Sequence, residues 1–267
     1  SAYRVSCMAE DAMGNILFGT ADGLFVVNKH NYVVENIPLT DRGSTCVEAL
    51  FTDSNGCTWI GVKGSVMVRM PDGTINVACK CTVGGKPASV AGFHEDYAGR
   101  LFVLQWGGGM LCRQRGEAVF ATLDWSQPVT PLQMIDDGQG YWVLTSGAGI
   151  VRMTLNGSRP ILTPQPATTG HHGLEHGLSL LRDSLSGLFW VTTLDNLYAY
   201  SVGSDGQLHP YSLDGYLPEG CKILDQLMES RDGDIYVAGF TPHTFIISPA
   251  RQGLTCLRAD AIRRLTA

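Results

Sequence analysis

Short apolar runs separated by glycine-centred turns follow one another along the whole chain. The first example, residues 11–27, has the sequence DAMGNILFGTADGLFVV, in which Gly14 and Gly23 are nine residues apart. Each glycine stands where a β-turn needs a residue that can adopt positive φ. Short apolar runs between such turns predict β-hairpins rather than helices.

The same layout returns at nearly regular intervals. The glycines of the first turn in each copy are Gly14, Gly56, Gly99, Gly140, Gly187 and Gly233, separated by 42, 43, 41, 47 and 46 residues. A repeat of this length with strand-like patterning predicts a β-propeller whose blades are four-stranded antiparallel sheets. Six repeats are visible, so we expect an all-β propeller that has six blades or is a fragment of a seven-bladed ring.

The repeats run without a linker-like break, which predicts a single β-propeller domain over residues 1–267. The expected blades span residues 3–37, 45–79, 88–122, 131–163, 177–212 and 221–258. Residues 259–267 match the start of a further inner strand and end where a turn ought to follow. The chain also begins with Ser, so we expect a piece of a longer protein whose signal sequence or membrane anchor lies outside it.

Charge and cysteine content narrow the possible partners. The net charge of −6 and the lack of Lys/Arg clusters argue against nucleic acid or an anionic membrane surface as the main partner. No apolar stretch is long enough to span a membrane. The 8 cysteines form no Cys-x-x-Cys pair, and only Cys79 and Cys81 stand two apart. We expect the cysteines to be buried thiols. In an oxidising compartment, a disulfide bond between two of them would remain an alternative.

The aromatic residues fall into two groups. Most follow a first-turn glycine at a fixed distance: Trp59, Phe102, Trp190 and Tyr236 by three residues and Trp142 by two. A fixed place in the repeat predicts one packing environment, between neighbouring blades. Trp106 lies instead in the turn LQWGGGM, and Trp125 lies in the connection ATLDWSQPVT.

Topology places these two tryptophans on one face of a propeller. Turns between second and third strands share that face with the connections between blades. The same face is expected to carry polar side chains from other blades, namely Asp22, Lys63, Asp195, Asn196, His243 and His172. An indole can stack on a pyranose while carboxylates and amides bind its hydroxyls. The pattern is typical of a sugar-binding surface, and ordinary loop residues without a ligand remain the alternative.

Signals for a metal or for catalysis are weak. The segment HHGLEH contains His172 and His176, which would share one face of a helix, as in metal-binding helices. The prolines and glycines around it disfavour that helix, so we expect no metal site and no cofactor. The sequence has no Gly-x-Ser-x-Gly elbow, no Walker loop and no Gly-x-Gly-x-x-Gly after a strand. No catalytic residue is assigned.

The repeats resemble a known family. MAEDAMGNILFGTADGLFVV and LFTDSNGCTWIGVKGSVMV are similar to the two-component regulator propeller repeat, whose pattern is an apolar strand, Asp-x-x-Gly-x-[Ile/Leu]-Trp-Ile-Gly-Thr, a short turn and Gly-Leu. YSLDGYLPEG, from Tyr211, resembles the Asp-Gly-Leu-Pro connector found before such repeats. The resemblance covers all six units, strongly in the first two and weakly in the sixth.

This resemblance implies the periplasmic sensor region of a hybrid two-component regulator of Bacteroidetes. Such a region would sense a ligand, commonly an oligosaccharide from glycan breakdown, as part of a membrane-anchored and dimerising protein. Kinase activity would lie outside this segment, so no enzyme is expected here. Propellers of that family usually have seven blades, whereas six repeats are visible in this chain.

Two functions of other classes stay open on sequence alone. A propeller enzyme, for example a hydrolase or a lyase similar to the streptogramin lyases, would need a metal and a His/Glu base on one face. A pure assembly module would use the disc for dimerisation.

Overall fold

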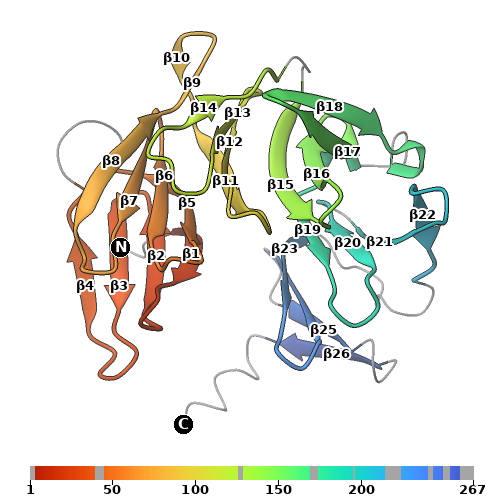
Figure 1. The fold of residues 1–267 in the computed structure, drawn as a ribbon. Helices are drawn as coiled ribbons and strands as arrows, with labels where there is room; N and C mark the ends of the chain where they lie inside the picture. The colour runs from red at the N-terminus through yellow and green to blue at the C-terminus, as the bar shows by residue number, and fades with distance from the viewer. Residues whose placement is uncertain are drawn as a thin grey trace. The chain divides into compact units, whose positions relative to one another are not determined.

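The protein is built almost entirely from short antiparallel β-strands. The structure is a computed structural model that describes residues 4–39, 45–125, 129–168, 174–194, 196–213, 224–239, 243–248 and 253–258. Six four-stranded sheets follow one another along the chain (Figure 1), with two short 3-10 helices, η1 (Pro166–Thr168) and η2 (Leu174–His176). The predicted all-β fold of propeller blades is therefore confirmed. Across these described ranges no helix has the length and apolar character needed to cross a membrane.

The strands of each sheet pair in chain order, from the first strand at one edge to the fourth strand at the other. The first three sheets are β1 (Val5–Glu10), β2 (Ile16–Thr20), β3 (Gly23–Val27) and β4 (Val34–Ile37); β5 (Val47–Thr52), β6 (Thr58–Val62), β7 (Ser65–Arg69) and β8 (Ile75–Lys80); and β11 (Val90–Glu95), β12 (Leu101–Gln105), β13 (Met110–Arg113) and β14 (Ala121–Thr122). The last three are β15 (Thr130–Asp136), β16 (Tyr141–Ser146), β17 (Gly149–Asn156) and β18 (Arg159–Pro164); β19 (Ser179–Arg182), β20 (Phe189–Thr192), β21 (Leu197–Val202) and β22 (Leu208–Tyr211); and β23 (Leu224–Glu229), β24 (Ile235–Gly239), β25 (His243–Ser248) and β26 (Gly253–Arg258).

The chain divides into two compact units. The first comprises residues 1–140 and 154–161, and the second comprises residues 141–153 and 162–267. The first unit contains the first three sheets, and the second unit contains the fifth and sixth sheets. The further inner strand predicted at 259–267 lies outside the described residues.

The turn between the first and second strands repeats one hydrogen-bond pattern. In the first sheet, the Asp11 amide donates to the carbonyl of Asn15 and the Gly14 amide donates to the carbonyl of Asp11, both at 2.9 Å. Gly14 has a φ of 80°, which side chains with a Cβ rarely tolerate. The same two bonds close the turns that begin at Asp53 and Asp96. This pattern accounts for the Asp-x-x-Gly spacing.

The fourth sheet departs from the expected turn. Gly138, not Gly140, adopts positive φ there, with a value of 80°, so the assignment of Gly140 as the turn glycine was wrong. The Asp137 amide donates to the carbonyl of Gly140 at 3.2 Å, which closes a turn one residue shorter than the turn at Asp11. The shorter turn explains why Trp142 follows Gly140 by two residues instead of three.

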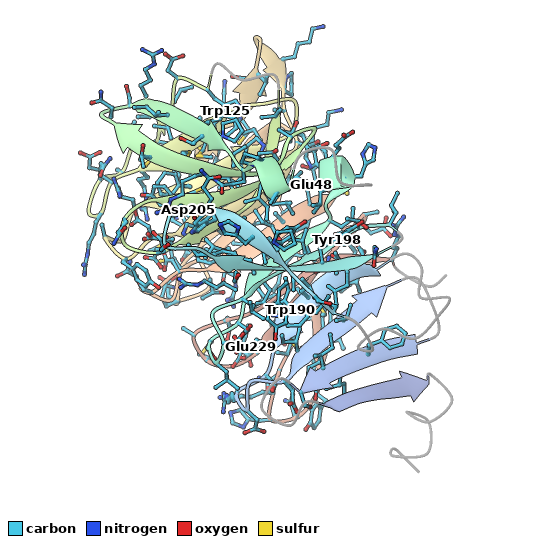
Figure 2. All side chains as sticks on the ribbon, turned by 90° about the vertical axis from the view of Figure 1, so that its right-hand side faces the viewer. Glu48, Trp125, Trp190, Tyr198, Asp205 and Glu229 are labelled. Atoms are coloured by element: carbon cyan, nitrogen blue, oxygen red, sulfur yellow. The ribbon has the colours of Figure 1, made fainter. Side chains whose placement is uncertain are left out.

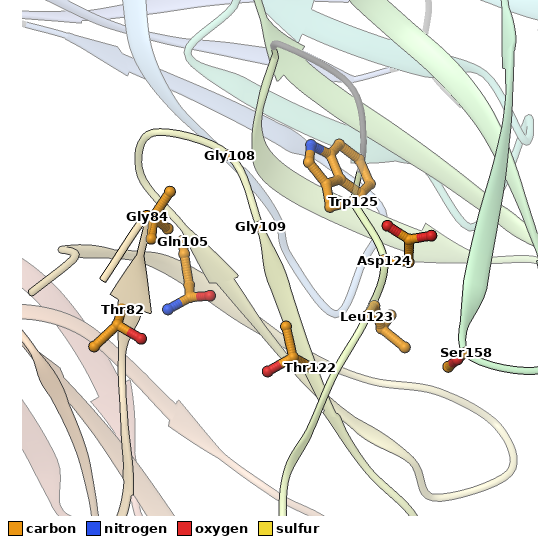
Figure 3. Close-up of a pocket in the computed structure, with 11 residues that line it drawn as sticks. Thr82, Gly84, Gln105, Gly108, Gly109, Thr122, Leu123, Asp124, Trp125 and Ser158 are labelled. Atoms are coloured by element: carbon orange, nitrogen blue, oxygen red, sulfur yellow. The ribbon is translucent and has the colours of Figure 1, made fainter. Parts of the chain in front are cut away.

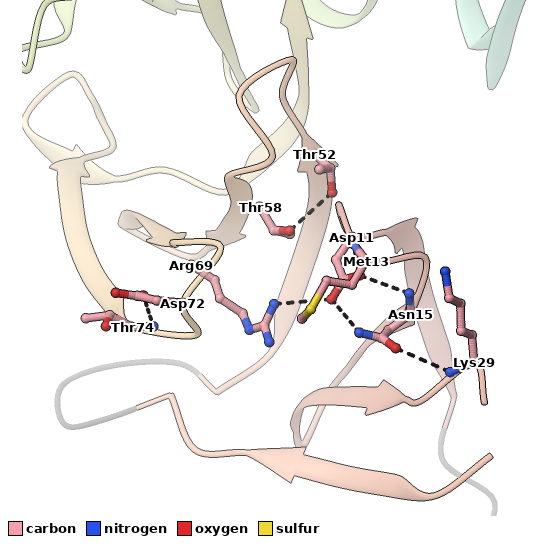
Figure 4. Close-up of polar contacts among 9 residues, drawn as sticks. All are labelled: Asp11, Met13, Asn15, Lys29, Thr52, Thr58, Arg69, Asp72 and Thr74. Carbon is pink, nitrogen blue, oxygen red and sulfur yellow. Dashed lines mark hydrogen bonds and ion pairs between the residues drawn. The ribbon is translucent and has the colours of Figure 1, made fainter. Parts of the chain in front are cut away.

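In the first, second, third and fifth sheets, a buried aspartate opens the turn, and in the first sheet it accepts several hydrogen bonds (Figure 4). Asp11 Oδ1 accepts from the amides of Met13 and Asn15, both at 2.9 Å, and Oδ2 accepts from Asn15 Nδ2 at 3.0 Å. Arg69, on β7 of the next sheet, brings its Nη1 to 3.4 Å from Asp11 Oδ2. The turn carboxylate therefore links one sheet to the next.

The same link recurs between the second and third sheets, with a tryptophan added. Trp59 Nε1 donates to Asp53 Oδ2 at 2.9 Å, and Arg113 Nη2 on β13 lies 3.9 Å from that oxygen. Arg113 Cζ also lies 4.5 Å from the centre of the Trp59 ring, a cation–π geometry. The Asp and Trp of one repeat and the Arg of the next thus form one contact between blades.

The second unit contains a similar arrangement. Trp190 Nε1 donates to Asp183 Oδ2 at 2.9 Å. Glu229, on the first strand of the sixth sheet, accepts hydrogen bonds from the amide and hydroxyl of Ser184 at 2.8 and 2.6 Å. Figure 2 labels Trp190 and Glu229 among the side chains. The first turn of the fifth sheet is therefore stabilised by a hydrogen bond within its own sheet and by hydrogen bonds to the sixth sheet.

The apolar core lies between neighbouring sheets. One cluster packs Leu17 of the first sheet against Val47 and Ile60 of the second, and another packs Trp59 against Val103 of the third. Four in-pattern aromatics are buried as predicted, with exposures of 3% for Trp59, 0% for Phe102, 2% for Trp142 and 3% for Trp190. Tyr236 is only half-buried.

The cysteines contribute to this packing. The cysteines that the structure describes as free thiols are Cys7, Cys46, Cys57, Cys79, Cys81 and Cys112. Cys81 and Cys112 are buried and the other four are half-buried, as expected for small apolar side chains. Burial raises the pKa of the Cys112 thiol to about 11, which keeps it protonated and unreactive at neutral pH.

Gly61 marks a close approach between the second and third sheets. A Cβ placed on Gly61 would lie 2.7 Å from the Cβ of Val90, on the first strand β11. Val90 is 1% exposed, and the register of β11 shifts directly after it. Gly19 has the same relation to Val47 one sheet earlier. The glycine that follows Trp-Ile in the repeat is therefore required by packing between blades.

We expect Gly61→Ala to destabilise the protein by about 1–3 kcal/mol, because the added methyl group overpacks the contact with Val90. Urea unfolding followed by tryptophan fluorescence measures this cost. The double variant Gly61→Ala/Val90→Ala is the control, since the smaller side chain makes room and the two costs should not add. A Gly61→Ala variant as stable as the unmodified protein would contradict the packing argument.

Candidate ligand-binding site

A hairpin that the sequence analysis did not predict stands between the second and third sheets. β9 (Thr82–Val83) pairs with β10 (Lys86–Pro87) across Gly84 and Gly85. These glycines have φ values of 58° and 76°. Two successive residues with positive φ form a type I′ turn, for which Gly-Gly is well suited. The hairpin projects beyond the neighbouring strands of the first unit (Figure 1).

The base of the hairpin is fixed to the turn between β6 and β7. The Cys81 amide donates to the carbonyl of Gly64 at 3.0 Å, and the Gly64 amide donates to the carbonyl of Ala88 at 2.8 Å. The Ala88 amide donates in turn to the carbonyl of Cys81 at 3.0 Å. These bonds fix both ends of the hairpin, so its two strands are held in place before any ligand binds.

A cavity of about 350 Å³ lies beside this hairpin, within the first unit (Figure 3). Its walls come from the hairpin, from the end of β12 and the turn after it, from the end of β14 and the residues that follow, and from Ser158 between β17 and β18. Figure 3 shows Thr82 and Gln105 on one side and Asp124 and Trp125 on the other. The volume is near the lower end of the range for small-molecule pockets, about 300–1,000 Å³.

Trp125 is held in place by its own segment. Its amide donates to the carbonyl of Leu123 at 2.8 Å, and its indole Nε1 donates to the carbonyl of Val129 at 2.9 Å. The Leu123 amide donates to the carbonyl of Met110 on β13 at 2.9 Å. Because the indole N–H already has an acceptor, the ring offers a ligand its apolar face.

Polar groups surround the tryptophan. Thr82, Thr122, Asp124 and Ser158 line the cavity with exposed side chains. The backbone of Asp124 is fixed by a hydrogen bond from its amide to the carbonyl of Ser158 at 3.1 Å. Gln105 is 1% exposed, and its side chain interacts with the Cys81 thiol. The cavity therefore combines an aromatic face with hydroxyls, a carboxylate and an amide.

Trp106 does not join Trp125 in this cavity. It lies in the turn between β12 and β13 with 49% of its surface exposed, and its amide donates to the carbonyl of Ser89 at 2.9 Å. Gly108 and Gly109 of the same turn do line the cavity. The structure thus places the two tryptophans on neighbouring segments and brings one of them to the pocket.

The other site residues expected from sequence lie elsewhere. Asp22 and Lys63 are exposed in the second turns of the first and second sheets, and neither lines the cavity. Asn196 is exposed in the second unit, where its amide donates to Thr193 Oγ1 at 3.1 Å. His243 begins β25 of that unit. Asp195 and His172 lie outside the described residues.

Sequence reasoning missed Gln105, Asp124 and the hairpin, although signals for them were present. Asp124 directly precedes Trp125, and Gln105 directly precedes Trp106. The Gly84–Gly85 pair in the connection between two predicted blades is a hairpin signal.

Of the HHGLEH segment, the structure describes Leu174, Glu175 and His176. Glu175 and His176 are exposed in η2, while His171 and His172 lie outside the described residues. Within the described ranges, no group of three or more His, Cys, Asp or Glu side chains could hold a metal ion.

Comparison with known proteins gives matches in structure only. No family model and no curated protein matches the chain. Catalytically inactive virginiamycin B lyase from Staphylococcus aureus, solved with quinupristin, superposes with a TM-score of 0.74 at 11% identity, over 96% of this chain and 84% of the lyase. Another match is the extracellular domain of a hybrid two-component system from B. thetaiotaomicron, with a TM-score of 0.56, 14% identity, and coverage of 95% of this chain and 43% of that one.

A second extracellular domain of this kind from B. thetaiotaomicron has a TM-score of 0.52 at 16% identity, over 96% of this chain and 46% of its own length. The kind of sensor that the repeat motif resembles is thus represented among the structural neighbours. At these identities the likeness establishes the β-propeller fold.

Proposed function

We propose that this chain is the extracytoplasmic ligand-sensing propeller of a two-component regulator and that it binds an oligosaccharide derived from a glycan. The observation that carries the proposal is the cavity beside the β9–β10 hairpin, where Trp125 presents an indole face among hydrogen-bonding side chains. Aromatic faces stack on the apolar face of a sugar ring, and hydroxyls and carboxylates bind its edges.

The structural neighbours support the sensing role. Two of them are extracellular domains of hybrid two-component systems, and both cover nearly all of this chain. A periplasmic location within a membrane-anchored protein follows from the same proposal. Ligand occupancy would be transmitted by a shift between conformations that differ in affinity for the sugar.

A propeller enzyme is the second candidate, because the lyase from Staphylococcus aureus superposes with a higher TM-score than the sensor domains. Incubation of the purified protein with quinupristin, followed by mass spectrometry, tests this function directly. Ring opening by elimination leaves the mass unchanged, so the readout is chromatographic retention and the fragmentation pattern. A change in either that depends on the protein would favour the enzyme over the sensor.

Trp125→Ala is expected to weaken oligosaccharide binding roughly tenfold or more, because it removes the stacking face and the apolar contact that goes with it. A thermal-shift screen of glycan fragments identifies the ligand, and calorimetry on the unmodified and variant proteins measures the affinity. The unfolding temperature should change little, since Trp125 is only half-buried.

Trp106→Ala is the matched control, since it removes an indole from a neighbouring turn that does not line the cavity. Its affinity should stay close to that of the unmodified protein. Equal affinities for all three proteins would remove the proposed site. A glycan screen without any hit would contradict the proposed function itself.

A further inference from the structure

The described residues that line the cavity carry a negative charge and no positive charge. Among the residues that the structure describes, Asp124 is the one charged residue that lines it, beside threonine, serine, glutamine, glycine and apolar side chains. The nearest basic residues along the chain, Lys80 on β8, Lys86 on β10 and Arg159 after Ser158, are exposed and do not line the cavity. A ligand in the cavity therefore meets a carboxylate without a compensating cation.

The hydrogen-bonding groups of the lining favour a ligand that donates hydrogen bonds. The Asp124 carboxylate only accepts hydrogen bonds, and it makes none with the residues that the structure describes. Trp125 Nε1 is already used by the carbonyl of Val129 at 2.9 Å. The ligand must therefore supply donors to Asp124, as the hydroxyls of a sugar do, and such charge-assisted bonds are stronger than neutral ones.

We propose that this cavity selects uncharged saccharides and rejects uronic acids and sulfated sugars, with Asp124 as the residue that determines the specificity. The inference rests on the proposed glycan-sensing function and names the chemical class of its ligand. A neutral pyranose stacks on Trp125 and donates its hydroxyls to Asp124. A carboxylate or sulfate at the same place is opposed by like charge and leaves Asp124 without a donor.

The test compares matched ligands that differ only in charge. Methyl glucopyranoside and methyl galactopyranoside, and short oligomers of each, are titrated by calorimetry beside the corresponding uronates. The unmodified protein should bind the uronate of each pair roughly tenfold or more weakly than the neutral sugar. Raising the salt concentration should reduce this ratio, because the discrimination is electrostatic.

Asp124→Asn separates charge from shape. The amide keeps the size of the side chain and one acceptor oxygen, so the neutral sugar should bind somewhat more weakly while the uronate no longer meets a like charge. The two affinities should therefore converge. Asp22→Asn is the matched control, because it removes the same charge from an exposed turn of the first unit that does not line the cavity. Its discrimination should equal that of the unmodified protein.

The outcomes distinguish this inference from the function on which it rests. Uronates that bind the unmodified protein as tightly as neutral sugars, or an Asp124→Asn variant with unchanged discrimination, would overturn the charge selection and leave glycan sensing intact. Failure of both ligand series and of the whole glycan screen would overturn the proposed function, and the selection with it.

Discussion

Trp59→Ala is expected to destabilise the protein by about 3–5 kcal/mol, the cost of truncating a large buried aromatic side chain. Trp59 is 3% exposed and packs edge-on against Phe120, with ring centres 5.7 Å apart. The substitution leaves a cavity between the second and third sheets. It also removes the hydrogen bond to Asp53 Oδ2 and the ring beneath the Arg113 guanidinium. Urea unfolding at neutral pH measures the loss.

Trp59→Phe divides this loss into parts. The phenyl ring keeps most of the packing, while Asp53 loses one donor, so a cost of about 1–2 kcal/mol is expected. Trp106→Ala serves as the surface control, because that side chain is 49% exposed and outside the repeat pattern. A Trp59→Ala cost as small as about 0.5 kcal/mol, typical of surface positions, would show that the residue does not hold neighbouring blades together.

The sequence was sufficient for the architecture because the repeat encodes local structure. Each Asp-x-x-Gly turn is closed by hydrogen bonds among neighbouring residues, such as Asp11 with Asn15. Its last position has a positive φ and therefore favours glycine. The buried aromatics followed from their constant distance to that turn. The exception, Gly140, arose because a second glycine two residues earlier allowed a shorter turn.

The contacts between blades could not be derived in the same way. Arg69 and Arg113 reach aspartates of the preceding sheet. The paired residues are far apart in the sequence, so the pattern within one repeat does not predict these contacts. The cavity depends on four segments that the fold brings together, from Thr82 to Ser158. Sequence pattern identified Trp125 as out of place in the repeat, but the hairpin that completes the pocket required the structure.

Asp183→Asn is expected to cost about 2–4 kcal/mol at neutral pH and to make unfolding less sensitive to acid. Asp183 is 2% exposed. Its Oδ1 accepts from the amides of Leu185 and Ser186, and its Oδ2 accepts from Trp190 Nε1 at 2.9 Å. In Asn one oxygen becomes an N–H donor, so either Trp190 or a turn amide loses its acceptor inside the protein.

The acid dependence follows from the ionised state of this carboxyl. Burial alone would raise the pKa of Asp183, but hydrogen bonds from the Ser186 side chain and amide, Trp190 and the Leu185 amide outweigh it, and the pKa lies below its usual value. A pKa that is lower in the folded than in the unfolded chain contributes stability above the unfolded value, about 3.9. That contribution is lost as the pH falls through the folded pKa.

The midpoint of urea unfolding should show this loss when it is measured from about pH 7 down to about pH 3, a range that includes the pKa of an unfolded aspartate. The gap in stability between the unmodified protein and Asp183→Asn should be constant at neutral pH and should narrow in acid. Asp11, whose pKa is also lowered, although burial opposes the hydrogen bonds from Asn15 and Met13, contributes equally to both proteins and cancels in the difference. Asp232→Asn, an exposed change in the turn between β23 and β24, is the control and should leave the midpoint at neutral pH unchanged. A gap between the unmodified and Asp183→Asn proteins that stays constant into acid would show that the Asp183 carboxylate does not stabilise the turn through its charge.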